Sequence, residues 1–191
     1  MAEIMSSIPE LEVLCDRRMV VLHGEQATGE FDTSGNPDPL FATADDAIYV
    51  FSGGSHHYAR FAIQLWDSAP PQSNEPWERV EYGLVTMLET PEHELWPDEP
   101  GPTVSIVDAQ LQQDLTTGER KPFFLQFPSH GHYVVRGHVR GFDEATRLPE
   151  ATYAHGVEQW LLQLWPTDQQ PTPMPLPRTG ASLPHSRLPH G

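Results

Sequence analysis

The clearest strand signal in the chain is the segment Phe61-Ala62-Ile63-Gln64-Leu65-Trp66. Its odd-numbered side chains are large and apolar, whereas the middle even-numbered position is the polar Gln64. A period of two places alternate side chains on opposite faces of a strand, so one face is expected in a core. Pro70 and Pro71 follow, and proline cannot continue a hydrogen-bonded ladder. We therefore predict a half-buried strand over residues 59–66.

Working outward from this segment, further short apolar or alternating runs are separated by turn residues. They lie at residues 11–15, 19–23, 47–51, 78–89, 103–107, 122–127, 133–140 and 158–165. The run 78–89 also fits a helix through Val80, Leu84 and Leu88, and residues 24–44 are expected to form a loop. Short strands without a long helical pattern predict an all-β fold, an antiparallel β-sandwich of about eight or nine strands.

Two local patterns favour a sandwich. Residues 127–133 place an apolar residue, a proline and a glycine before Tyr133, which is typical of a tyrosine corner. The hexapeptide 160–165 also echoes 61–66, and we interpret the pair as two core strands of similar pattern. Residues 1–166 are expected to form one domain. The Pro-rich residues 167–191 lack periodic apolar residues and are expected to be a disordered or extended tail.

Composition restricts the class of partner. The 191 residues contain 27 acidic and 11 basic side chains, a formal charge of -16. Binding to nucleic acids or to anionic membranes depends on Lys and Arg, so neither is expected. The single cysteine, Cys15, permits no intrachain disulfide, which fits a reducing compartment. No signal peptide or membrane span is recognisable, and we expect a cytoplasmic protein.

Motifs for chemistry are sparse. His130 and His132 stand two residues apart, about 7 Å if extended, a spacing that suits two ligands of one metal. We expect these histidines to be exposed or in turns, and we keep as an alternative a metal-binding protein or enzyme that uses them with carboxylates. Cys15 lies in an apolar run and is interpreted as a buried, inert thiol. We predict no catalytic residue, no metal and no cofactor.

Charge is distributed unevenly along the chain. Residues 1–100 hold 19 acidic and 4 basic side chains, and residues 75–99 hold 8 acidic side chains against Arg79 alone. Carboxylates interleaved with aromatic anchors suit recognition of a basic protein. The predicted partner-binding residues are Glu75, Trp77, Glu78, Glu81, Glu89, Glu92, Glu94, Trp96, Asp98 and Glu99. The alternative for this segment is a solvated edge that keeps the protein soluble.

One predicted strand has the opposite character. Four of its side chains would share one face and form a basic stripe: His132, Arg136, His138 and Arg140. We expect the stripe to pair with carboxylates of a neighbouring strand in the same molecule, and an external anion site is the alternative.

Three stretches together resemble the competence-protein-J-like group and related uncharacterised actinobacterial proteins. They are residues 44–50, residues 61–66, and the pattern Pro128-x-x-Gly131-x-Tyr133. Members of the group include an inhibitor of a DNA-entry nuclease. The resemblance implies a small β-sandwich that works by binding and performs no chemistry, and it supplies no inhibitory residues.

These observations lead to a non-enzymatic, acidic β-sandwich binding protein as the main hypothesis. Its sharpest form is an inhibitor or immunity-type protein for a basic partner such as a nuclease, with carboxylates standing where DNA phosphates would sit. A structural or assembly component remains an alternative, with Trp66 and Trp165 facing another subunit.

Overall fold

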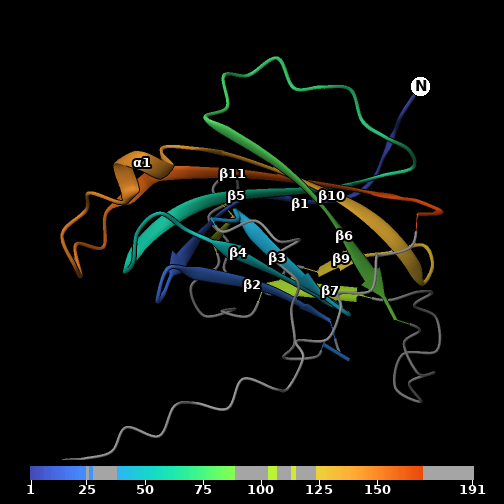
Figure 1. Ribbon diagram of the computed structural model, residues 1–191, viewed down its shortest axis with the longest axis horizontal. Coiled ribbons are helices and arrows are strands. Elements are labelled where there is room, and N and C mark those ends of the chain that lie inside the picture. The colour runs from blue at the N-terminus through green and yellow to red at the C-terminus, as the bar shows by residue number, and fades with distance from the viewer. Residues whose placement is uncertain (25, 28–37, 89–102, 107–112, 115–123, 170–191) are drawn as a thin grey trace, which may run out of the picture.

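The computed structural model in Figure 1 describes residues 1–24, 26–27, 38–88, 103–106, 113–114 and 124–169. The strands in these residues are β1 (Ile4–Cys15), β2 (Met19–Gly24), β3 (Phe41–Ala44), β4 (Ala47–Phe51), β5 (His57–Trp66), β6 (Arg79–Met87), β7 (Thr103–Ile106), β8 (Gln113–Asp114), β9 (Phe124–Gln126), β10 (Gly131–Arg140) and β11 (His155–Pro166). One short helix, α1 (Phe142–Ala145), follows β10. None of the described helices is long and apolar enough to cross a membrane.

The strands form two sheets that lie as two layers in Figure 1. One sheet has the order β6-β10-β11-β5-β1-β8, and the other has the order β3-β4-β2-β7-β9. Apolar side chains from both layers pack together in one hydrophobic core. The predicted all-β sandwich is therefore confirmed.

Several details differ from the prediction. The described chain has more strands than expected, and β5 and β11 pair in parallel. The described residues 78–88 contain the strand β6 and no helix, and β3 lies within the stretch expected to be a loop. Strand β1 begins at Ile4, well before residue 11. A register shift between Ile8 and Leu11 separates these two buried side chains by three residues, which conceals the period of two.

The two similar hexapeptides lie side by side. Strands β5 and β11 pair in register, with Phe61 opposite Trp160 and Gln64 opposite Gln163. The rings of Phe61 and Trp160 are fully buried and stacked, with centroids 5.8 Å apart. The echo thus reflects two neighbouring core strands that present the same kind of side chain to the same layer.

Contact between the layers depends on glycine at two positions. Phe41 of β3 packs against Gly83 of β6 and Gly137 of β10. A Cβ added at Gly83 would lie 2.6 Å from the Phe41 ring, and one at Gly137 would lie 2.9 Å from it. Only a residue without a side chain lets the ring come this close to the sheet.

The predicted tyrosine corner is present. The Tyr133 hydroxyl donates a hydrogen bond to the Ser129 carbonyl at 2.8 Å. Phe127 packs edge-on against the Tyr133 ring, with centroids 4.8 Å apart. Both rings are buried, so the corner fixes the entry to β10 within the core. The proposed tail falls largely outside the described residues, since 170–191 are not among them.

Candidate functional site

Only part of the predicted partner-binding segment is described. Residues outside the described part are Glu89, Glu92, Glu94, Trp96, Asp98 and Glu99. The described members are Glu75, Trp77, Glu78 and Glu81, which lie before and within β6, the edge strand of its sheet.

Each described carboxylate of this segment has a partner within the molecule. Glu75 forms an ion pair with Arg140 at 3.2 Å. Glu78 accepts hydrogen bonds from the backbone N–H groups of Phe142 and Asp143, both at 3.1 Å, at the start of α1. Glu81 accepts one from the backbone N–H of Leu40 at 2.6 Å. These contacts give the three carboxylates roles in the fold.

The basic stripe is paired internally, as predicted, but mostly with neutral groups. Arg136 is buried and donates to the Gln163 side-chain oxygen at 2.6 and 3.0 Å. Its guanidinium also donates to the carbonyl of Pro71 at 2.8 Å. His138 lies 3.2 Å from the same Gln163 oxygen, and the Trp77 ring packs 5.2 Å from the His138 ring. Most partners of the basic stripe are thus amide and carbonyl oxygens, where carboxylates were expected.

Within the part of the chain that the structure describes, His130 and His132 do not come together with a carboxylate in one group of possible ligands. His130 is exposed before β10, and the His132 ring lies 3.3 Å from the Thr86 hydroxyl. Among the described residues, the group of three His, Cys, Asp or Glu side chains with ligand atoms close together is Cys15, His57 and Glu158.

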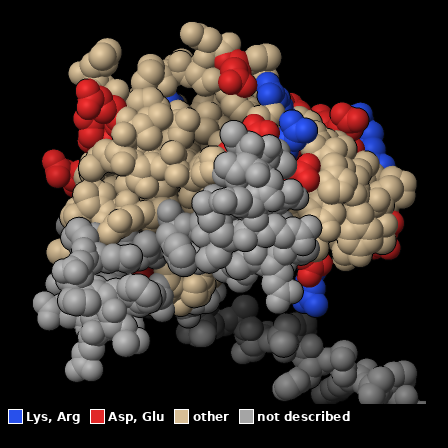
Figure 2. Space-filling model, turned by 180° about the vertical axis from the view of Figure 1, so that it is seen from behind, with Lys and Arg blue, Asp and Glu red and all other residues tan. Residues whose placement is uncertain are grey.

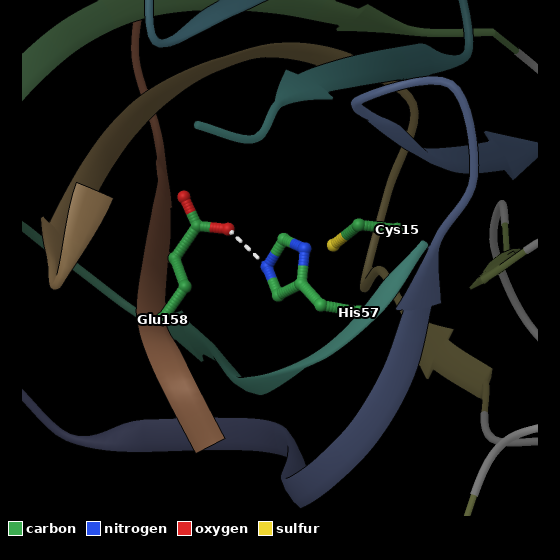
Figure 3. A group of neighbouring side chains, drawn as sticks. All are labelled: Cys15, His57 and Glu158. Carbon is green, nitrogen blue, oxygen red and sulfur yellow. Dashed lines mark hydrogen bonds and ion pairs between the residues drawn. The ribbon is translucent and has the colours of Figure 1, made fainter. Parts of the chain in front are cut away.

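Three strands supply this group, which we call the buried cluster. Cys15 ends β1 and is the register partner of His57, which begins β5. Glu158 lies on β11, two residues before the buried Trp160 and on the same face. All three residues are 0% exposed, and Figure 3 shows their side chains pointing toward one another.

Glu158 is the hydrogen-bond acceptor at the centre of the buried cluster. It accepts from the Ser52 hydroxyl at 2.5 Å and from the backbone N–H of Gly53 at 3.0 Å. The Nε2 atom of His57 lies 3.1 Å from the same carboxylate. A carboxylate there selects the tautomer with hydrogen on Nε2, which leaves an electron pair on Nδ1. Nδ1 is buried and has no hydrogen-bond partner among the described residues, and it faces Cys15 in Figure 3.

The Cys15 thiol is buried, in agreement with the prediction. Burial, followed by the nearby charge of Glu158, raises the pKa of Cys15 to about 12, although contacts with Ser52 and Ala59 oppose the rise. The free thiol therefore carries its proton at neutral pH, and a thiolate forms there only if a cation compensates the charge.

Strained backbone surrounds the buried cluster. Five residues other than glycine adopt a positive φ in the turns next to the cluster: Arg17, Arg18, His56, Ala151 and Tyr153. The backbone N–H of His56 donates to the Cys15 carbonyl, and that of Ser52, whose hydroxyl binds Glu158, donates to the Arg18 carbonyl. Such conformations are retained only where the surroundings enforce them, and they are common at functional sites.

Sequence reasoning did not assemble this cluster. One usable signal was present, because the predicted strand 158–165 places Glu158 on the same face as Trp160, where an acid is unusual. Nothing in the sequence indicates that Glu158 meets His57 and Cys15, which lie 101 residues or more away.

Comparisons with solved structures find two likenesses. ComJ from Bacillus subtilis, an inhibitor of the DNA degrading activity of NucA, is 12% identical with a TM-score of 0.48, and covers 87% of this chain and 99% of its own. The product of crocagin biosynthetic gene J is 14% identical with a TM-score of 0.44, and covers 87% and 98%. The predicted resemblance to the competence-protein-J-like group is thus found as a weak likeness of fold. No family model matches the chain. No curated protein matches it either.

Proposed function

We propose that the chain is a non-enzymatic cytoplasmic binding protein that presents carboxylates to a basic protein partner and inhibits it, the partner being a nuclease. The observation that carries this proposal is the excess of carboxylates, which leaves a formal charge of -16 over 191 residues. Even if each of the 11 basic side chains paired with a different acid, 16 of the 27 carboxylates would lack a Lys or Arg partner within the chain. A surface of this kind steers a basic partner and repels nucleic acids.

Three arginines of the described part already form ion pairs within the molecule. Arg60 pairs with Glu10 at 3.6 Å, Arg79 with Asp38 at 3.4 Å and Arg140 with Glu75 at 3.2 Å. Figure 2 shows carboxylates in separate groups on one face of the molecule, with most of the basic side chains in the right half of the view beside carboxylates. The cations of these three pairs are therefore already used within the fold, which leaves most of the acidic excess to a partner.

The structure narrows which carboxylates to test. Glu75, Glu78 and Glu81 hold the fold together, so their removal would confuse binding with stability. The remaining acids of the predicted segment, Glu89, Glu92, Glu94, Asp98 and Glu99, are the ones to neutralise. NucA, whose DNA degrading activity ComJ inhibits, is the first nuclease to test.

The experiment measures inhibition of DNA degradation by NucA, and retention of NucA on the immobilised chain, at low and high salt. We expect both to weaken at high salt, because salt screens exposed charges. Neutralising the five acids of residues 89–99 should abolish both. A matched control neutralises five exposed carboxylates elsewhere, Glu3, Asp45, Glu144, Glu150 and Asp168, and should retain them. Equal retention at both salts, or equal loss in both variants, would contradict the proposal.

A further inference from the structure

We propose that Cys15 and His57 bind one thiophilic metal ion, of the zinc or monovalent copper class, in a buried site where Glu158 orients the His57 ring. The side chains come from β1, β5 and β11, and their potential ligand atoms all lie within 4.8 Å of one another. The site shares no residue with the predicted acidic segment or with the pair His130 and His132. It therefore adds a function that binding of a basic partner does not require.

The unpartnered nitrogen of His57 supplies the first argument. Nδ1 is completely buried and accepts no hydrogen bond from any residue that the structure describes, and a buried polar atom in that condition is costly. It faces the Cys15 side chain, so a sulfur and a nitrogen ligand point into the same space (Figure 3). A metal ion placed between them would satisfy the nitrogen.

Glu158 supplies the second argument through its contact with the other side of the ring. Its carboxylate lies 3.1 Å from Nε2 of His57, the arrangement by which an outer carboxylate orients a metal-binding imidazole. Ser52 and the backbone of Gly53 hold the carboxylate in place, at 2.5 and 3.0 Å. His57 is thus prepared to bind a cation through Nδ1 before any ion arrives.

Charge and ligand softness specify the class of ion. The Cys15 thiolate and the Glu158 carboxylate together balance a divalent ion, and the thiolate alone balances a monovalent one. Binding breaks the S–H bond of Cys15, forms a sulfur–metal bond and releases the proton to solvent. A sulfur and an imidazole nitrogen prefer zinc or monovalent copper over the oxygen-seeking magnesium and calcium ions.

The test supplies ions to the full chain both folded and during refolding, since a buried site loads most readily as the chain folds. Cobalt(II) serves as the probe for zinc, because a thiolate–cobalt bond produces a charge-transfer absorption band. Monovalent copper is supplied separately in competition with a copper chelator. We expect one ion per chain from one of these arms, and a rise in Tm for the loaded protein. Magnesium should give neither effect.

Variants locate the site. Cys15→Ala should lose the bound ion and the thiolate band, and His57→Gln should lose the ion. Glu158→Gln, which retains an acceptor oxygen, should weaken affinity about 10–100-fold. The double variant His130→Gln/His132→Gln should bind like the unaltered chain.

Two results would overturn the proposal. One is the absence of stoichiometric binding in both arms by the unaltered chain, which needs no variant to interpret. The other is binding that survives unchanged in Glu158→Gln or in a folded Cys15→Ala protein, or that disappears with His130 and His132. Cooperative unfolding of each variant, followed by circular dichroism, establishes that it is folded.

Discussion

Nε2 of His57 lies 3.1 Å from a carboxylate oxygen of Glu158, and both side chains are completely inaccessible to solvent. The contact joins strands β5 and β11, which pair in parallel within the sheet. The same carboxylate binds the Ser52 hydroxyl and the Gly53 backbone, which follow β4 of the opposite sheet. One side chain of β11 thus holds together both layers at the end of the sandwich that carries Cys15.

Removal of Glu158 should therefore be strongly destabilising. We expect Glu158→Ala to lower the free energy of unfolding by about 3–5 kcal/mol, because three buried donors lose their acceptor. Glu158→Gln retains an oxygen and should cost clearly less. Urea denaturation of the ion-free protein measures both. Similar losses for the two variants would show that the acceptor role is unimportant.

A second carboxylate that joins the two layers is Asp46, in the turn between β3 and β4. Asp46 adopts a positive φ of 59° and is buried. Its side chain accepts from the backbone N–H of Leu88 at 2.7 Å and of Gln26 at 3.3 Å. Asp46→Ala should destabilise by about 2–4 kcal/mol, through two lost hydrogen bonds and a strained backbone.

Two matched variants separate these causes. Asp46→Asn retains a side-chain oxygen and tolerates positive φ, so we expect a loss of about 1 kcal/mol. Asp45→Ala changes an exposed neighbour and should alter the free energy of unfolding by less than about 0.5 kcal/mol. Equal losses at positions 45 and 46 would refute the role assigned to Asp46.

Gly137 is expected to tolerate no side chain. Gly137→Ala places a Cβ against the Phe41 ring and should lower the free energy of unfolding by about 1–3 kcal/mol. The smaller side chain of Phe41→Leu in the same background should recover part of the loss, which a double-mutant cycle measures. Strictly additive effects would show that the two positions are not in contact.

Substitutions in the turn between β1 and β2 should raise the free energy of unfolding. Arg17 and Arg18 both have positive φ, at 49° and 63°, in a two-residue turn where asparagine and glycine are favoured. Arg17→Gly should raise the free energy of unfolding by about 0.5–1 kcal/mol through relief of this strain. Arg18→Gly should gain less, because the Arg18 side chain donates to the Gly53 carbonyl. Thermal denaturation ranks the two variants.

Acid should weaken the fold in part through His138. Burial lowers the pKa of His138 below its ordinary 6.5, and the charge of Arg136 adds to this, while Gln163 and Glu75 oppose it. The Trp77 ring packs against the same imidazole. Because the unfolded chain takes up the proton first, the stability is complete above pH 6.5 and falls as the pH decreases through 6.5 toward the lower pKa of the folded state.

His138→Gln should therefore flatten the dependence of unfolding free energy on pH below 6.5. The exposed His130→Gln serves as the control and should leave that dependence unchanged. Urea denaturation at a series of pH values measures both. An unchanged slope in His138→Gln would exclude this histidine as a source of acid sensitivity.

The sandwich class was predictable because burial leaves a local trace. Alternation at 61–66 and 133–140 reveals which side chains face the core, and each strand carries this trace within its own residues. The tyrosine corner was equally local, since Tyr133 and Ser129 are four residues apart. Strand β1 shows the limit, because its register shift between Ile8 and Leu11 breaks the pattern on which the prediction depends.

Hydrogen-bond partners that are distant in the sequence could not be predicted from any local pattern. The acidic segment was recognised by charge, but that charge does not reveal that Glu78 binds the start of α1 or that Glu75 meets Arg140. The basic stripe was assigned to the correct face, yet its amide partner Gln163 depends on which strand lies beside β10.

The sequence by itself determined most of the strands, the core-facing side chains of those that alternate and the excess of negative charge, since each is a property of neighbouring residues or of composition. Only the tertiary structure decided that β11 pairs in parallel with β5 and that Cys15, His57 and Glu158 meet. The physical reason is that the period of two within a strand determines which side chains face the core, whereas the packing of the whole chain determines which strand lies beside it.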